Sequence, residues 1–185
     1  MIYIVKQSEG SLSWLSISRL NNLNLFDHNT CRKLMGWTGM QRRFCRQYFG
    51  FTDTIRSAAK LTISECQSQF KNRRWNCSTI DRPHLFGRLP EVAMREASFV
   101  YALSSAALTY SITSACSQGK LSGCSCDESR KGKKANGYIW SGCSDNIAYG
   151  MGVAENFLDP RIRNKPNLML LNLHNLETGR QVNIF

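Results

Sequence analysis

The fold is decided by one stretch of the chain, which reads Glu65-Cys66-Gln67-Ser68-Gln69-Phe70-Lys71-Asn72-Arg73-Arg74-Trp75-Asn76-Cys77-Ser78. Residues 53–71 carry apolar side chains at helical spacing, which predicts an amphipathic helix that buries one face. Thr52 or Asp53 is the expected N-cap of this helix. A bond between neighbouring cysteines would join Cys66 on the helix to Cys77. The stretch therefore predicts a helix that leads into a cross-linked turn.

Further helices are predicted on both sides of this stretch. We expect them at about 40–48, 90–116, 145–158 and 168–176. Pro90 suits the first turn of the long helix. Ser144 or Asp145 is expected to cap the next helix, and Pro160 to end it. Together these segments predict a mainly α fold, a disulfide-clamped bundle of helices.

Two segments break the helical pattern. Residues 1–30 are rich in Asn and Ser and only weakly periodic, which predicts a loosely ordered lead-in to a helical domain over residues 31–185. Between Cys116 and Cys143, Gly, Ser and Lys dominate, and residues 138–140 (Tyr-Ile-Trp) are the only strand-like run. We therefore expect a small cysteine-bound loop or hairpin in that part of the chain.

Composition excludes several classes of protein. With 185 residues, 42% hydrophobic and 20% charged, the chain can form one folded domain and is not disordered throughout. Its net charge of +11 favours polyanionic partners. Residues 97–116 lack charge over the length that a bilayer requires, yet seven of them are Ser or Thr. A buried helix of a folded domain is therefore the better interpretation of that segment.

The two ends of the chain predict a fragment or an incomplete gene model. Only five apolar residues, 1–5, precede Lys6, and they do not make a convincing secretory signal. At the other end the chain stops at Phe185 without a turn or a polar tail.

Eight cysteines decide the compartment and the chemistry, and they lie at positions 31, 45, 66, 77, 116, 124, 126 and 143. Structural zinc sites space paired cysteines by about two to four residues. Only one residue separates Cys124 from Cys126, and His28, His84 and His174 are scattered, so no metal site is predicted. Disulfides fit better and indicate an oxidising compartment. Neighbour pairing would give 31–45, 66–77, 116–124 and 126–143, although eight cysteines allow about a hundred pairings.

Two further features each have two interpretations. Residues 76–78 form an N-glycosylation sequon at Asn76 if the chain is secreted, and a chance match otherwise. A set of basic residues could bind heparan sulfate or form a solvated face; its members are Arg42, Arg43, Arg46, Lys71, Arg73, Arg74, Lys131, Lys133 and Lys134. Arg73 and Arg74 could also pack on Trp75 through cation–π contacts.

No catalytic arrangement is visible in the sequence. It has no Gly-x-Ser-x-Gly elbow and no Gly-rich phosphate loop, and neither His84 nor His174 has an acidic partner at helical spacing. We therefore predict no enzyme activity and no cofactor. The alternatives are an intracellular zinc or nucleic-acid module and a lipid-acting hydrolase, but no helix-turn-helix or RNP-like pattern supports nucleic-acid binding.

Several motifs occur in the order found in one family. The opening stretch, with Arg73-Arg74-Trp75-Asn76-Cys77-Ser78 at its end, strongly resembles the signature of Wnt secreted signalling proteins. Further matches follow in the same order at residues 95–97, 99–102, 123–126, 140–147, 173–175 and 179–180. The resemblance covers about residues 31–182 and indicates the N-terminal, helical half of a Wnt.

The resemblance implies an extracellular, glycosylated and lipid-acylated ligand. Its expected partners are the cysteine-rich domain of Frizzled receptors and an LRP-type co-receptor, with an acyltransferase and a secretion carrier during export. It implies disulfides between Cys66 and Cys77, Cys116 and Cys124, and Cys126 and Cys143, with Cys31–Cys45 as the fourth, and a glycan on Asn76. The acylated serine and the distal cysteine-rich domain of the family are expected beyond Phe185.

Overall fold

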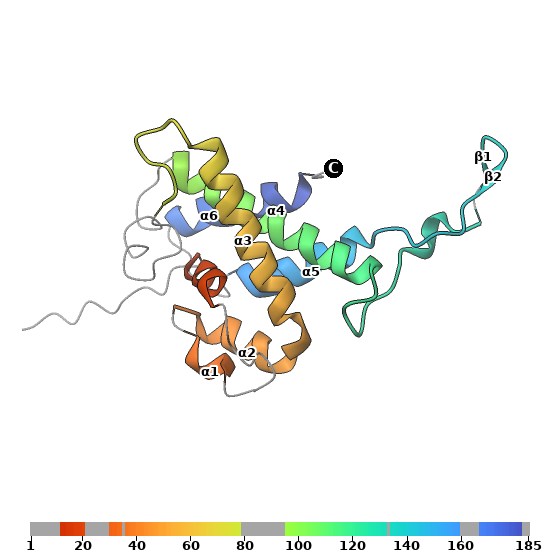
Figure 1. The fold of residues 1–185 in the computed structure, drawn as a ribbon, viewed down its shortest axis with the longest axis horizontal. Coiled ribbons are helices and arrows are strands. Elements are labelled where there is room, and N and C mark those ends of the chain that lie inside the picture. Colours follow the sequence, from red (N-terminus) through yellow and green to blue (C-terminus); the bar gives the residue numbers. More distant parts are fainter. Residues whose placement is uncertain are drawn as a thin grey trace, which may run out of the picture.

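The computed structural model describes residues 12–20, 30–34, 36–78, 95–132, 134–159 and 167–182. Its elements are the 3-10 helix η1 (Ser13–Arg19), α1 (Thr30–Lys33), α2 (Gly39–Gln47), η2 (Phe49–Phe51), α3 (Thr52–Gln69), α4 (Arg95–Ser117), η3 (Glu128–Arg130), β1 (Lys134–Ala135), β2 (Tyr138–Ile139), α5 (Ile147–Leu158) and α6 (Asn167–Gln181) (Figure 1). The predicted mainly α, disulfide-clamped fold is confirmed.

Helix α4 forms the centre of the bundle, and α3, α5 and α6 pack against it. Thirteen of its 23 residues are buried. Among the described residues it is the one helix long and apolar enough to cross a bilayer, yet 67% of that apolar stretch is buried inside the protein. This burial agrees with the interpretation of the uncharged segment as a core helix.

Two glycines let neighbouring helices approach α4 closely. A Cβ atom at Gly150 of α5 would overlap the Thr113 hydroxyl group and lie 2.9 Å from the Thr109 carbonyl oxygen. A Cβ atom at Gly179 of α6 would overlap the carbonyl group of Ala102. Because side-chain atoms do not pack at such distances, these two helix contacts require glycine.

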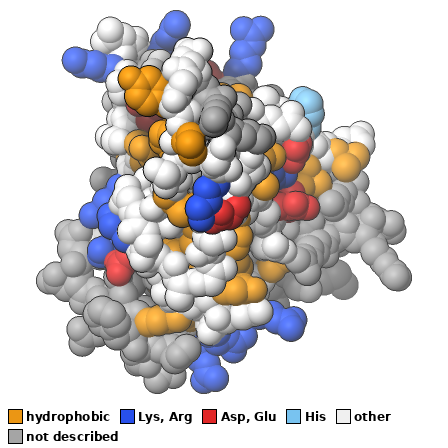
Figure 2. Space-filling view, turned by 90° about the vertical axis from the view of Figure 1, so that its right-hand side faces the viewer, with side chains coloured by type: hydrophobic (Ala, Val, Ile, Leu, Met, Phe, Trp, Pro, Cys, Tyr) orange, Lys and Arg blue, Asp and Glu red, His pale blue; other side chains and the backbone are white. Residues whose placement is uncertain are grey.

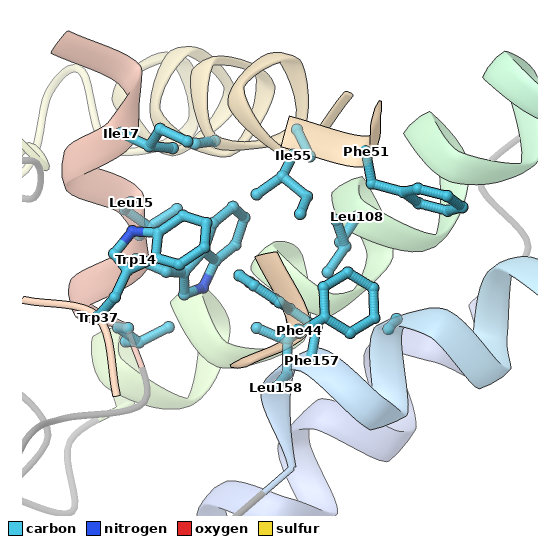
Figure 3. Close-up of a cluster of buried hydrophobic side chains, with 14 of the residues drawn as sticks. Trp14, Leu15, Ile17, Trp37, Phe44, Phe51, Ile55, Leu108, Phe157 and Leu158 are labelled. Carbon is cyan, nitrogen blue, oxygen red and sulfur yellow. The ribbon is translucent and has the colours of Figure 1, made fainter. Parts of the chain in front are cut away.

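A cluster of buried aromatic rings joins distant parts of the chain (Figure 3). Phe157 of α5 makes edge-to-face contacts with Trp14, Trp37 and Phe44, with ring centroids 5.6, 5.2 and 5.4 Å apart. Trp14 comes from η1, Trp37 from the segment before α2, and Phe44 from α2 itself. Each such pair adds about 0.5–1.5 kcal/mol beyond the burial of its surface. The cluster therefore fixes η1 and α2 against α5.

The helices predicted at 40–48 and 53–71 are confirmed as α2 and α3. Helix α2 begins with a capping box, in which the Thr38 hydroxyl accepts from the Gln41 N–H (3.2 Å) and the Gln41 side chain accepts from the Thr38 N–H (3.0 Å). The predicted side-chain cap of α3 is wrong. Helix η2 runs directly into α3, so the Thr52 hydroxyl donates backwards to the Phe49 carbonyl oxygen (2.7 Å).

Helix α5 begins two residues after the position predicted for its start. Asn146, and not Ser144 or Asp145, is its N-cap, because the Asn146 side-chain oxygen accepts from the Tyr149 N–H (3.0 Å). The stop predicted at Pro160 lies outside the described residues, as does the start predicted at Pro90.

Helix α6 extends past its predicted end at residue 176 and reaches Gln181. Gly179 resembles a helix-ending residue in the sequence, but in the structure it lies inside the helix where α6 meets α4. Leu176, Gly179 and Arg180 are the buried residues of α6, so packing of this last turn against the bundle sustains the helix.

Residues 12–20 belong to the segment expected to be a loosely ordered lead-in, yet they form η1 and pack against α3. Leu12, Trp14, Leu15 and Ile17 are each at most 1% exposed. Serines alternate with these side chains, so the segment lacks an α-helical period and gave no helical signal. The other residues of the predicted lead-in, 1–11 and 21–29, lie outside the described residues.

Residues 118–145, called the arm below, extend from the end of α4 and carry the hairpin of β1 and β2. Figure 1 shows the hairpin at the far end of the arm, projecting from the helical body. The strands are antiparallel, with Lys134 opposite Ile139 and Ala135 opposite Tyr138. Asn136 (φ 50°) and Gly137 (φ 85°) form the turn, and Asn-Gly suits such a two-residue hairpin turn. The predicted cysteine-bound excursion is confirmed as a hairpin.

Candidate interaction surfaces

Four disulfides hold the surfaces of the molecule in place and use all eight cysteines. They join Cys31 to Cys45, Cys66 to Cys77, Cys116 to Cys124 and Cys126 to Cys143. The first two lie in the body, where these cysteines are at most 1% exposed, and the last spans the arm. In the chain-entropy account each loop of this size contributes about 3 kcal/mol. With every cysteine bridged, none is available as a zinc ligand.

Trp75 packs the turn after α3 against the body. Its ring lies edge-to-face with Phe70, with centroids 5.5 Å apart, and Phe70 in turn contacts Phe99 of α4 at 5.2 Å. Arg73 and Arg74 are exposed beside it. The ring of Trp75 therefore makes an aromatic contact, and its cation–π contact with Arg73 or Arg74 stays a prediction.

Asn76 lies at the surface of this turn. Its side-chain oxygen accepts a hydrogen bond from the Ser78 N–H (3.2 Å), and both residues are exposed. Cys77 between them is fully buried and adopts a left-handed backbone conformation (φ 61°), held by its bond to Cys66. The sequon is thus presented outward by a turn that the disulfide anchors.

The structure separates the basic residues considered as one polyanion site into three groups. Arg42, Arg43 and Arg46 lie on α2, Lys71, Arg73 and Arg74 lie on the turn after α3, and Lys131 and Lys134 lie on the arm. In Figure 1, α2 is at the bottom, the turn after α3 is at the top and the hairpin is at the right. Lys133 lies outside the described residues. The single basic face is therefore not found, and three smaller ones replace it.

A groove of about 830 Å³ lies between α2 and α5, and no sequence motif indicated it. Phe44 and Tyr48 line it from the side of α2, and Tyr149 and Val153 line it from α5. Burial raises the pKa of the Tyr149 hydroxyl, and the neighbouring Tyr48 raises it further. Arg43 is the one charged residue among those that line the groove. Because its two walls are far apart in the sequence, only the packed fold creates it.

The arm carries three consecutive exposed apolar side chains. Tyr138, Ile139 and Trp140 are 81%, 60% and 51% exposed. The Trp140 indole N–H donates to the Ser144 hydroxyl oxygen (2.9 Å), and its ring covers Gly142, where a Cβ atom would lie 2.8 Å from it. Figure 2 faces the side from which the arm projects, and near its top hydrophobic side chains lie close to Lys and Arg side chains.

A charged cluster joins the end of α5 to the end of α6. The Arg180 guanidinium is 4% exposed and donates to both Asp159 carboxylate oxygens (2.8 and 3.0 Å) and to Glu177 (2.6 Å). The bond from Arg180 lowers the pKa of the Glu177 carboxyl, and Gln181 lowers it further. Burial alone would lower the pKa of Arg180, but the bonds to Asp159 and Glu177 outweigh it and raise that pKa.

The described residues hold no group of three or more side chains placed to bind a metal ion. Of the two histidines considered for hydrolysis, His174 is exposed on α6, and His84 lies outside the described residues. The features that the structure does bring together are surfaces, namely the groove, the turn with its sequon, and the arm.

The fold and its bridges define a class of protein, a mainly helical domain clamped by disulfides and suited to an oxidising compartment. Residues 33–184 match the model of the Wnt family. The chain belongs to the Wnt family.

Individual relatives agree with this assignment. The chain is 44% identical to human protein Wnt-2b over 155 residues, which cover 81% of this chain and 40% of that protein. It is 41% identical to Xenopus laevis protein Wnt-5b over 160 residues, 82% of this chain and 44% of that protein. A chain of the structure described as human WLS in complex with WNT8A matches with a TM-score of 0.55 and 36% identity, over 72% of this chain and 44% of that one. The chain thus spans less than half the length of these relatives.

Proposed function

We propose that residues 31–182 act as the helical scaffold of an extracellular Wnt signalling ligand, which works by recognition and not by catalysis. One observation carries the proposal: the family match over residues 33–184 includes seven of the eight bridged cysteines. Four disulfides suit a protein exported to an oxidising space. The proposal includes that this chain represents the N-terminal half of such a ligand, whose acylated serine hairpin belongs to the other half.

The proposed partners follow from the family and from one structural relative. Frizzled receptors and an LRP-type co-receptor are the partners that the resemblance implies. The likeness to a chain of the WLS–WNT8A complex supports a WLS-type carrier as a partner during export. In this proposal the rigid bundle positions an acylated hairpin against Frizzled and offers its own surface to the co-receptor.

A chimera tests the scaffold role directly. Residues 31–182 of this chain, which include all eight bridged cysteines, would replace the matching segment of human Wnt-2b. Cells bearing Frizzled and an LRP-type co-receptor would report signalling. We expect the chimera to be secreted and to signal, because the matched segment keeps the fold that holds the acylated hairpin. A Wnt-2b lacking the segment is the negative control. A chimera that is secreted with all its disulfides but gives no signal contradicts the proposal.

We also propose that Asn76 carries the glycan of this domain. Its exposure on a turn anchored by the Cys66–Cys77 disulfide supports this, since the sequon is open to the transferase. In secreted material, an N-glycosidase should shift the wild-type band, and Asn76→Gln should remove the shift. An unshifted wild-type band would show an unmodified sequon.

A further inference from the structure

The tip of the arm has a composition that the scaffold role does not explain. Residues 129–144 contain one Arg, three Lys and no acidic residue, and they include the exposed Tyr138, Ile139 and Trp140. We propose that this tip inserts shallowly into the surface of an anionic phospholipid bilayer. The inference goes beyond the proposed function and does not depend on which receptor the protein binds.

The geometry of the hairpin favours a lipid surface over a folded partner. Successive side chains of a strand point to opposite faces, so Tyr138 and Ile139 lie on opposite sides of the ribbon. Both are exposed, at 81% and 60%, so the tip is apolar on its two faces. A fluid bilayer surface can surround such a tip, whereas a rigid protein surface would cover only one face.

The chemistry of the side chains also fits the boundary between lipid and water. Tyr and Trp are the residues enriched there, because each has an apolar ring with a polar edge. The hydrogen bond from Trp140 to Ser144 fixes the indole while leaving 51% of the residue exposed. The ring is therefore held over Gly142 on the arm, with about half of the residue still exposed for contact with lipid.

Charge complementarity identifies the lipid as anionic. Lys131 is exposed and pairs with Glu128, which is also exposed, at 3.0 Å. Such a surface pair is weak, so the lysine can exchange it for a phosphate group. Lys134 lies opposite Ile139 in the hairpin register, so a second basic residue belongs to the same hairpin. Each basic residue near an anionic membrane surface adds a favourable electrostatic contribution to the free energy of binding.

The shape of the molecule allows the contact. The hairpin stands at the end of a projecting arm, so it can reach a surface without contact from the helical body (Figure 1). The Cys126–Cys143 disulfide ties the two sides of the arm together below the tip. The arm therefore presents Tyr138, Ile139 and Trp140 as one unit.

Sedimentation with lipid vesicles tests the proposal on the whole oxidised chain. We expect binding to phosphatidylcholine vesicles that contain phosphatidylserine, and weaker binding to phosphatidylcholine alone. Tyr138→Ser with Ile139→Ser should lower the partition coefficient about tenfold, because binding scales with the apolar surface inserted. The matched control is Tyr110→Ser with Leu170→Ser, which removes two body side chains of 49% and 51% exposure and should change little.

Charge variants test the anionic part of the contact. Lys131→Glu should weaken binding to phosphatidylserine vesicles about fivefold or more. Lys60→Glu makes the same change in net charge at an exposed position of α3 and should have less effect. An equal loss in both variants would mean that only the net charge acts, which would overturn a role for the arm.

Fluorescence identifies which residue meets the lipid. The chain has four tryptophans, of which Trp14 and Trp37 are fully buried and Trp75 is partly buried. Brominated phosphatidylcholine in the phosphatidylserine vesicles should quench emission in the wild type, and Trp140→Phe should remove that quenching.

Three results would overturn the proposal: no vesicle binding by the wild type, binding that Tyr138→Ser with Ile139→Ser leaves unchanged, or quenching that persists in Trp140→Phe. A different outcome would assign the arm to a sulfated polysaccharide. In that case the protein would not bind vesicles but would be retained on heparin, and Lys131→Glu alone would weaken that retention.

Discussion

At the scale of the residue, Gly150 and Gly152 give opposite predictions although they lie two positions apart on α5. A Cβ atom at Gly150 would overlap Thr113, whereas nothing lies within 4 Å of a Cβ at Gly152. Gly150→Ala should lower the free energy of unfolding by about 1–3 kcal/mol through overpacking. Gly152→Ala should raise it by roughly 0.5–1 kcal/mol, because alanine favours the helix. Urea unfolding of both variants checks this, and equal effects would refute the close contact of α5 with α4.

The Arg180 cluster makes a second prediction at this scale. Its guanidinium is buried, and Asp159 is only 20% exposed, so removing Arg180 leaves a poorly solvated carboxylate. Arg180→Met should therefore lower the free energy of unfolding by about 3–5 kcal/mol. Lys131→Met is the control, since Lys131 and Glu128 pair at the surface, with side chains 60% and 65% exposed. Similar losses in the two variants would count against a buried clamp.

The pKa of Glu177 gives that cluster a pH dependence with a definite sign. Its pKa is lower in the folded protein than the ordinary value of 4.5, because Arg180 donates to its carboxylate. The stability from this bond is therefore complete above about pH 4.5 and is lost as the pH falls through the lower, folded-state pKa. Glu177→Gln should make the unfolding midpoint less sensitive to acid over that window. If the unfolding midpoint of Glu177→Gln falls from neutral pH to acid as steeply as that of the wild type, the assignment is contradicted.

At the scale of the element, the disulfides divide into those that stabilise the body and one that shapes the arm. Cys66 and Cys77 are fully buried in the body, whereas Cys143 is exposed on the arm. Cys66→Ala with Cys77→Ala should lower the free energy of unfolding by about 3 kcal/mol. Cys126→Ala with Cys143→Ala should change that value much less and instead make the arm sensitive to protease. Equal thermal destabilisation by the two pairs would show that the arm folds as part of the body.

Elements with a clear hydrophobic period were predictable from the sequence, and those that depend on distant partners were not. Helices α2 and α3 follow from their spacing of apolar residues. Helix η1 does not, because Trp14 becomes a core residue only through its contact with Phe157. The last turn of α6 lies beyond the predicted end at residue 176, because packing of Gly179 and Arg180 against the bundle sustains it and the apolar spacing does not show that packing.

The candidate surfaces divide in the same way, into features that the sequence indicates and features that only the folded chain creates. The cysteine spacing indicated the neighbour pairs, and the Asn136-Gly137 dipeptide was an available signal for the hairpin turn. The groove between α2 and α5 could not be predicted, since Tyr48 and Tyr149 meet only in the folded chain. The basic set was grouped by charge alone, and a sequence does not reveal that α2 and the turn after α3 lie at opposite ends of the body.

At the scale of the whole molecule, the separated basic groups predict how a long polyanion would bind. We propose that heparan sulfate contacts α2 and the turn after α3 as two separate sites. Arg43→Glu with Arg46→Glu, and Arg73→Glu with Arg74→Glu, should each lower the salt concentration that elutes the protein from heparin. Lys60→Glu with Lys120→Glu makes an equal charge change at exposed positions away from both groups. If this control lowers the elution salt as much, the binding reports net charge and not either site.

The aromatic cluster has a consequence for how the protein is made. Trp14 and Trp37 leave the ribosome early, but their ring partner Phe157 is synthesised more than a hundred residues later. At ordinary elongation rates the two indoles wait roughly ten seconds without that partner. The bundle can therefore close only after α5 has been synthesised, and until then both indoles remain without that ring partner.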